Sequence, residues 1–320
     1  MSARAVGAAI GARILAAVAT LVGATALLLA LLVWAPGDPI DVVTPIGADA
    51  ALRPQLEREF GLDRPATVRW LSHLARFATL DLGTSYAYRP GAPVAELLPV
   101  PAARTFGLVA GASALVVGWG TALALATAGR PSIVRSVVHA ISLAPGFALA
   151  HAAVASINAV TWWAITRGTV ARPEWFALPD QPSAVRTSVA VVVLAVGSGA
   201  LAEVHAEVED AIVRIRTSPW IDAARARGAS TWPLVLRALI PSVAATLAGR
   251  ATLLVSGAVV IENVLLLRGI GAVLWRAAEL RDYELALSIA VLLAGFVAGA
   301  RLLADGVRFA VDPRLREAAG

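Results

Sequence analysis

Long, almost uninterrupted runs of apolar residues alternate with shorter polar segments along most of this chain. A helix needs about 20 mostly apolar residues to cross the hydrocarbon core of a bilayer. Runs of this kind predict six membrane-spanning helices, at residues 14–34, 105–128, 137–157, 187–201, 244–266 and 285–303. We therefore expect an all-α, polytopic membrane protein.

The segments around these runs suggest three parts. Residues 1–34 are expected to form a cytoplasmic amino terminus and the first span, and residues 35–102, which are more polar, an extracytoplasmic loop region. Residues 103–320 would hold the five further spans. Within this last part, residues 203–243 are charged and lack an apolar run of spanning length, so we expect a cytoplasmic loop there.

The distribution of arginine sets the expected orientation. Short segments that face the cytoplasm are enriched in arginine, whereas long loops cross the membrane largely regardless of charge. With six spans and a cytoplasmic start, the arginines of the short inside segments are Arg4, Arg13, Arg130, Arg135, Arg214, Arg216, Arg225, Arg227, Arg237, Arg308, Arg314 and Arg316. Both termini are therefore expected on the cytoplasmic side of the membrane.

The composition excludes several classes of function. Hydrophobic residues make up 58% of the chain and the mean hydropathy is +0.74, which is more apolar than usual soluble domains. All 27 basic residues are arginine, so no Walker A loop, whose lysine grips ATP phosphates, is present. The net charge of +5 is placed mostly between apolar runs, which indicates membrane topology rather than nucleic-acid binding.

The residues that usually carry chemistry form no recognisable site. The chain has no cysteine, and its four histidines, His73, His139, His151 and His205, lack metal-ligand spacing. No nucleophile–base arrangement is evident, so we expect neither an enzyme nor a metal or cofactor bound by this chain. Glu203 and His205 begin the charged segment and are expected to be solvated or interfacial.

Residues 220–241 form the most informative segment. Asp222 to Arg227 are helix-compatible, and Gly228 can adopt the backbone angles of a tight turn. Ser230 is a candidate cap for a second helix, which Pro241 is expected to disturb. The pattern predicts a short amphipathic helical hairpin, an element suited to docking into a groove of a partner protein.

This segment resembles the EAA loop of ABC importer permeases. The likeness rests on Asp222-Ala223-Ala224, with aspartate in place of glutamate, then Gly228, then the hydrophobic triplet Leu239-Ile240-Pro241. The run from Ala224 to Ser230 is similar to the first permease of the dipeptide, oligopeptide and nickel importers. The resemblance implies contact with ATPase partners at Asp222, Ala223, Ala224, Arg225, Arg227, Gly228, Ala229, Ser230 and Pro241.

Other motifs of the same subfamily occur in the same order along nearly the whole chain. They are Pro36-Gly37-Asp38-Pro39, Gly61-Leu62-Asp63-Arg64-Pro65, Asp81-Leu82-Gly83-Thr84-Ser85, Pro93-Val94-Ala95-Glu96-Leu97-Leu98, Glu262, Gly269-Ile270-Gly271, Arg281-Asp282-Tyr283 and Asp312-Pro313-Arg314-Leu315-Arg316. Departures from the subfamily pattern at Ala238, Ser242 and Arg268 leave the transported substrate open.

The resemblance implies a set of partners. These are a second, related permease, two ATP-binding subunits that hold ATP and Mg²⁺, an extracytoplasmic solute-binding protein and the lipid bilayer, with no nucleic acid. Di- or oligopeptides are the leading cargo, and nickel or metal chelates are the alternative. A secondary transporter without ATPases and a non-transporting membrane scaffold are the other readings, and co-purification of ATPases distinguishes them.

Glu262 is a second candidate site residue. It lies near the outer end of the predicted fifth span, and carboxylates within membrane spans are often functional. A role in the gate or the transport path is one hypothesis. A simple pairing with an arginine at the membrane interface is the other.

Overall fold

The computed structural model describes residues 3–35, 40–41, 44, 52–129, 133–168 and 184–311, with only the backbone for residues 3–10 and 308–311. Three features singled out above lie outside the described residues. They are the turn Pro36-Gly37-Asp38-Pro39, Arg130 and the tail that begins at Asp312.

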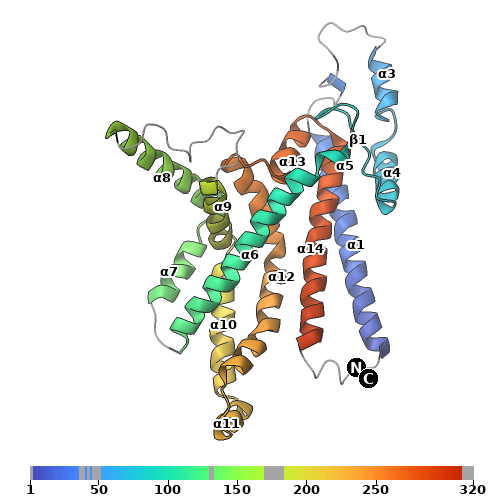
Figure 1. Ribbon diagram of the computed structural model, residues 1–320. Coiled ribbons are helices and arrows are strands. Elements are labelled where there is room, and N and C mark those ends of the chain that lie inside the picture. Colours follow the sequence, from blue (N-terminus) through green and yellow to red (C-terminus); the bar gives the residue numbers. More distant parts are fainter. Residues whose placement is uncertain are drawn as a thin grey trace. The chain divides into compact units, whose positions relative to one another are not determined.

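Within the described residues, the chain is helical apart from one short hairpin (Figure 1). The helices are α1 (Ala3–Trp34), α3 (Leu52–Glu59), α4 (Ala66–Ala78), α5 (Val94–Leu97), α6 (Pro99–Thr127), α7 (Ile133–Ser142), α8 (Gly146–Thr166), α9 (Ala184–Gly197), α10 (Ala200–Arg216), α11 (Pro219–Ala226), α12 (Trp232–Val264), α13 (Ile270–Glu279) and α14 (Tyr283–Val311). Strands β1 (Thr84–Ser85) and β2 (Ala92–Pro93) pair antiparallel. The expected all-α class is confirmed.

Five of the described helices, α1, α6, α8, α12 and α14, are long and apolar enough to cross a membrane. A sixth span results if α9 and α10, which meet at an angle of 55°, are counted as one bent span. The bend has a local cause, because Gly199 takes a φ of 72° between the two helices. Only glycine adopts this left-handed conformation without a steric penalty.

The predicted third span, residues 137–157, is wrong in its bounds. The apolar run is broken between α7, which ends at Ser142, and α8, which begins at Gly146. Pro145 stands immediately before α8 with φ −57° and ψ 136°. The residue before a proline is disfavoured in the helical region, so a helix tends to end there. The helix of spanning length is therefore α8.

The first part of residues 203–243, where a charged cytoplasmic loop is expected, forms most of helix α10 (Ala200–Arg216). Helix α10 carries a stripe of buried apolar residues at helical spacing, which comprises Leu201, Val204, Val208 and Ile212. This face packs against α12, while Arg214 and Arg216 remain exposed. The high content of charge concealed the stripe, because average hydropathy ignores helical periodicity.

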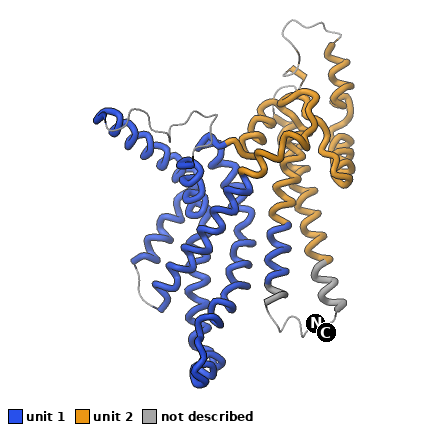
Figure 2. Tube along the Cα trace, viewed as in Figure 1, with its two compact units in different colours: residues 1–10, 105–267, 299–320 blue, residues 11–104, 268–298 orange. Residues whose placement is uncertain are grey.

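The chain divides into two compact units (Figure 2). Unit 1 comprises residues 1–10, 105–267 and 299–320, and unit 2 comprises residues 11–104 and 268–298. In unit 1, glycines allow helices to approach closely. A Cβ at Gly197 would lie 2.5 Å from the Gly146 Cα, and a Cβ at Gly257 would lie 2.9 Å from the Leu194 Cδ1. A larger residue at Gly197 would have to displace a helix, whereas one at Gly257 would have to shift the Leu194 side chain.

Candidate functional site

Helix α11 forms the first arm of the predicted hairpin. Ser218 precedes it in extended conformation, and Pro219 occupies its first turn, where proline loses no hydrogen bond that the helix would otherwise make. Asp222 also lies in the first turn. A carboxylate there interacts favourably with the positive end of the helix dipole. These local preferences explain why the chain starts a new helix directly after α10.

Gly228 ends α11 in a Schellman motif. The Gly228 N–H donates to the Arg225 carbonyl at 2.9 Å, and the Ala229 N–H donates to the Ala224 carbonyl at 3.0 Å. Gly228 has a φ of 72°, so the motif requires the left-handed conformation that glycine supplies. No atom lies within 4 Å of the position that a Cβ would take. The structure therefore has the predicted glycine break, and the demand for glycine comes from the backbone rather than from crowding within the chain.

The surface of α11 is divided between a buried and an exposed face. Ile221 and Ala224 are buried, whereas Asp222, Ala223 and Arg225 are exposed. Asp222 and Arg225 form an ion pair at 3.2 Å, with 67% and 54% of their side chains exposed. A pair this exposed adds at most about 1 kcal/mol, so both charges remain accessible to a partner. Arg227, Ala229 and Ser230 are exposed as well.

The second arm begins one residue later than expected. Thr231, not Ser230, is the N-cap residue of α12, and it makes no capping hydrogen bond through its side chain. Pro241 lies inside α12, which nevertheless runs on to Val264. A proline lacks the N–H that would bond the carbonyl four residues earlier, here that of Arg237. Helix α12 thus lacks this one bond at Pro241 but is not interrupted.

Apolar side chains accompany the charged residues around the hairpin. Trp220, Trp232, Leu236 and Ile240 are exposed in the isolated chain. Large apolar side chains grouped near exposed charges are typical of surfaces that another protein covers. The segment from Pro219 to Pro241 therefore has the chemistry of a docking element. The predicted site residues from Asp222 to Ser230 lie close together because they are neighbours in the sequence. Pro241 lies on the second arm.

Glu262 lies near the end of α12 and is almost completely buried, with 1% exposure. Its Oε1 accepts a hydrogen bond from the Thr105 hydroxyl of α6 at 2.6 Å. Both residues belong to unit 1. The bond joins two helices of spanning length, so the carboxylate is part of a helix–helix contact.

A buried polar cluster in unit 1 escaped the sequence analysis. His205 has 0% exposure, although it was expected to be solvated or interfacial, and its Nε2 lies 2.9 Å from the Thr127 hydroxyl. One turn further along α10, Glu209 is also buried and pairs with Arg135 of α7 at 3.2 Å. The two side chains share the buried face of α10 because they are four residues apart. Of the two residues that begin the charged segment, only Glu203 is half exposed, as expected. It pairs with Arg250.

A second missed feature is the carboxylate of Asp282 in unit 2, which is fully buried. Its Oδ2 accepts hydrogen bonds from the Ser85 hydroxyl at 2.6 Å, the Ala87 N–H at 3.1 Å and the Tyr88 N–H at 3.0 Å. Its Oδ1 accepts from the Leu285 N–H at 3.2 Å. Asp282 thus caps α14 and holds the loop after β1 at the same time. The sequence signal for the first role is an aspartate immediately before a helical run.

Tyr86 connects the same two segments. Its hydroxyl donates to the Arg281 carbonyl and accepts from the Tyr283 N–H at 2.9 Å. Burial raises the pKa of Tyr86 far above its ordinary value, so the hydroxyl stays protonated and remains a donor. The Phe60 ring stacks on Tyr86 with 5.2 Å between centroids. The motifs around Ser85 and Asp282 therefore form one structural unit.

Glu284 anchors α4 to the start of α14. It lies 3.1 Å from the His73 Nδ1 and accepts from the Arg76 guanidinium at 2.6 Å. Gly83 packs directly against this carboxylate, because a Cβ there would lie 2.6 Å from the Glu284 Oε2. With a φ of 73°, Gly83 meets both a conformational and a steric requirement for glycine.

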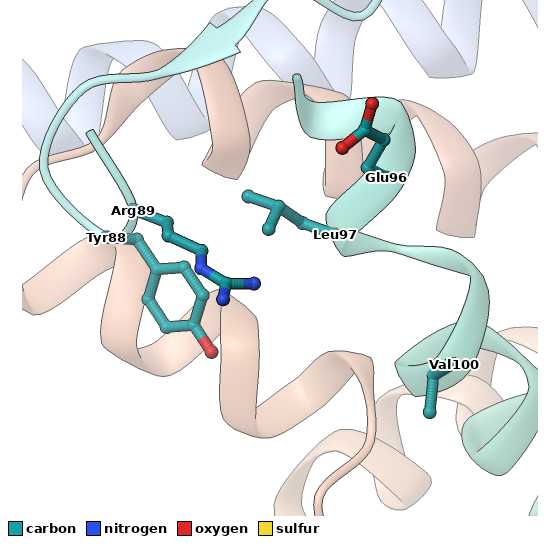
Figure 3. Close-up of a pocket in the computed structure, with 5 residues that line it drawn as sticks. All are labelled: Tyr88, Arg89, Glu96, Leu97 and Val100. Carbon is teal, nitrogen blue, oxygen red and sulfur yellow. The ribbon is translucent and has the colours of Figure 1, made fainter. Parts of the chain in front are cut away.

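One pocket of unit 2 opens beside this network. It has a volume of about 420 Å³ and is lined by Tyr88, Arg89, Glu96, Leu97 and Val100 (Figure 3). Its walls come from the loop after β1 and from α5 with the start of α6. In the part of the chain that the structure describes, no group of three or more His, Cys, Asp or Glu residues could hold a metal ion.

Comparison with known proteins adds independent information. Residues 105–317 match the family model described as "Binding-protein-dependent transport system inner membrane component". A putative peptide permease protein of Brucella ovis is 27% identical over 317 residues, which cover 95% of this chain and 97% of the relative. The oligopeptide transport system permease protein AppB of Bacillus subtilis is 26% identical, covering 95% and 97%.

A third relative, the glutathione transport system permease protein GsiC of Pectobacterium atrosepticum, is 26% identical over 294 residues, which cover 88% of this chain and 90% of the relative. The family match extends over more than half of the chain, and it agrees with the apolar helices in indicating a multi-pass protein of the inner membrane. This chain belongs to the family of binding-protein-dependent transport system inner membrane components, as an ABC importer permease of the peptide group.

Proposed function

We propose that this chain is a pore-forming subunit of an ABC importer that moves di- or oligopeptides across the cytoplasmic membrane. Relatives that match it over nearly their whole length are named for the transport of peptides, oligopeptides and glutathione, which is itself a small peptide. The energy would come from ATP hydrolysed with Mg²⁺ on partner subunits, because the chain has no lysine for a phosphate-binding loop.

The observation that carries this proposal is the geometry of α11 and its turn. A rigid short helix, closed by the Gly228 Schellman motif, presents Asp222, Ala223, Arg225 and Arg227 to its surroundings. It is flanked by α10 and α12, which pack against each other and continue into the apolar part of unit 1. In the proposed mechanism, closure of the ATPase subunits displaces α11, and the helices on either side carry this displacement into the pore.

The energy for switching must come from a difference in contact between two states. A ligand or partner shifts a conformational equilibrium only by its differential affinity for the two conformations. We propose that the ATPases bind the hairpin differently with and without ATP. The small, exposed side chains Ala223 and Ala229 permit close approach, while Arg225 and Arg227 can pair with acidic residues of the partner.

The proposal includes an orientation. The turn around Gly228 and both termini would face the cytoplasm, and residues 35–102 would lie outside, where they meet a solute-binding protein. A second, related permease would complete the pore. The distribution of arginine supports this arrangement, since Arg214, Arg216, Arg225 and Arg227 surround the hairpin.

For Glu262 we propose a role in gating. Its hydrogen bond with Thr105 joins α6 to α12 at 2.6 Å. Relative movement of these two helices would break this bond between them. Such a contact favours two discrete states over intermediate ones.

Co-purification tests the proposal. The chain, expressed with its neighbouring transport genes and extracted in mild detergent, should retain two ATP-binding subunits and a second permease. Reconstituted vesicles should then take up peptide only with ATP and the solute-binding protein present. Peptide uptake by the chain without any ATPase subunit would support a secondary transporter and contradict the proposal.

A further inference from the structure

Three polar side chains of unit 2 line the pocket without a partner in the described part of the chain. They are the Tyr88 hydroxyl, the Arg89 guanidinium and the Glu96 carboxylate. In Figure 3, Tyr88 and Arg89 lie next to each other on one wall, and Leu97 extends toward Arg89 from the other. The Glu96 carboxylate lies above Leu97 and points away from Arg89, and Val100 lies apart from the other four residues.

The polar wall of this pocket is fixed by its backbone. The Tyr88 N–H donates to the Asp282 carboxylate at 3.0 Å, and the Arg89 N–H donates to the Ser85 hydroxyl at 2.9 Å. Ser85 in turn donates to Asp282, which is completely buried. The fold therefore holds the backbone of Tyr88 and Arg89 in place, while their side chains make no bond within the described structure. A fixed backbone lowers the part of the entropic cost of binding that comes from ordering the loop.

The chemistry of the pocket selects its occupant. A guanidinium binds a carboxylate with two parallel hydrogen bonds, and the neighbouring phenol can donate a third. Leu97 and Val100 provide an apolar wall beside them. Tyr and Arg are enriched among the residues that dominate protein–protein binding. The pocket is open at the surface, so it suits a protruding side chain of a protein better than an enclosed small molecule.

We propose that this pocket is a docking point for the solute-binding protein and receives an aspartate or glutamate that is followed or preceded by an apolar residue. The inference rests on the function proposed above, which places residues 35–102 outside the membrane. The family description itself names transport that depends on a binding protein. Asp282 is a positioning residue for the pocket, because it holds the Tyr88 backbone and also caps α14.

Receptor binding by the assembled transporter tests this inference. The solute-binding protein encoded beside this chain is immobilised, and the transporter in lipid nanodiscs is titrated by biolayer interferometry. Arg89→Glu should raise Kd at least about tenfold, and Arg89→Gln should have a smaller effect, because reversal adds repulsion to the lost bond. The Kd of the unmodified transporter should also rise with salt, since an exposed ion pair is screened.

Arg276→Glu is the matched control. Arg276 is also an exposed arginine of unit 2, but it lies outside residues 35–102 and does not line the pocket, so its reversal changes the net charge equally and should leave Kd within about twofold. Equal Kd values for Arg89→Glu and the unmodified protein would overturn the inference, as would a receptor that does not bind at all. The same titration is also run on the purified chain alone. If ATPase subunits do not co-purify with the chain, the proposed function is contradicted. The effect of Arg89→Glu on receptor binding to the chain alone still tests the docking site.

Discussion

The Ser85 hydroxyl donates a 2.6 Å hydrogen bond to the carboxylate of Asp282, although 197 positions separate these residues in the sequence. The bond is buried, and Asp282 accepts three more, from the N–H groups of Ala87, Tyr88 and Leu285. The loop after β1 is thereby fixed to the first turn of α14. Four hydrogen bonds of this part of unit 2 thus converge on one carboxylate.

Asp282→Asn should destabilise unit 2. The asparagine side chain has the same shape as the aspartate side chain. Its NH₂ group, however, replaces one acceptor oxygen and would face hydrogen-bond donors, so at least one buried N–H loses its partner. Losing hydrogen bonds to a buried charged group costs about 1.5–3 kcal/mol each. Limited proteolysis of the chain in detergent should show faster cleavage within residues 84–93. Ser85→Ala removes one of the four bonds and should have a smaller effect; an unchanged cleavage rate in Asp282→Asn would contradict the assignment.

Gly83 and Gly91 form a matched pair for separating backbone strain from crowding. Both have left-handed backbone angles, with φ of 73° and 77°. A Cβ at Gly83 would meet Glu284 at 2.6 Å, whereas nothing lies within 4 Å of the corresponding position at Gly91. Gly91→Ala should cost about 1–2 kcal/mol of unfolding free energy from strain alone.

Gly83→Ala should cost more than Gly91→Ala, because the Glu284 carboxylate must move away from His73 or Arg76. The midpoints of thermal unfolding in detergent measure this difference directly. If both alanine variants unfold at the same temperature, the close contact between Gly83 and Glu284 does not contribute to stability.

The Arg135–Glu209 pair and the Arg214–Glu207 pair allow a comparison of a buried carboxylate with a more exposed one. Glu209 has 7% of its side chain exposed, whereas Glu207 has 37%. Removal of a partner from a buried charge leaves a desolvated group unpaired, which costs several kcal/mol, and exposed pairs add little. Arg135→Gln should therefore lower the unfolding midpoint clearly, and Arg214→Gln should lower it hardly at all. Similar midpoints for both would contradict the buried placement of Glu209.

Gly228 tests the proposed role of the hairpin in coupling. Replacement by a bulky residue such as Val forces a β-branched side chain into the left-handed conformation and adds volume at the proposed contact with the ATPase. The protein should still reach the membrane, since no neighbouring atom of the chain is displaced. ATP hydrolysis should then proceed without peptide uptake. Gly228→Asn is the milder control, because Asn tolerates this conformation better than other residues; normal uptake by Gly228→Val would count against coupling.

Much of the architecture follows from patterns within single segments. Apolar runs located α1, α6, α12 and α14, and the glycine of the 220–241 segment located the break after α11. These features depend on residues that are close in sequence. The boundary between α7 and α8 was missed because the apolar run continues across Pro145, where backbone restrictions outweigh hydropathy.

The contacts between distant segments could not be predicted. His205 and Glu209 look like members of a solvated charged stretch until helical periodicity places them on the same face as Val208. Ser85 and Asp282 were recognised only as separate motifs, because no local pattern records which hydroxyl will meet which carboxylate. The docking segment from Pro219 to Pro241 could be predicted because its structure depends on residues that are close in sequence. The pocket beside Arg89 could not be predicted, because its shape depends on the hydrogen bonds that fix the loop after β1.

Cysteine crosslinking tests the central claim most directly, because the natural chain contains no cysteine and a single substitution introduces a unique label. Ala223 is exposed on α11, and Ala95 is exposed on α5 in unit 2. In the assembled transporter, Ala223→Cys should crosslink to an ATP-binding subunit with a short bifunctional reagent, and Ala95→Cys should not. A Cys at position 223 that reacts only with lipid-soluble reagents, or that never crosslinks although the ATPase subunits co-purify, would contradict the account.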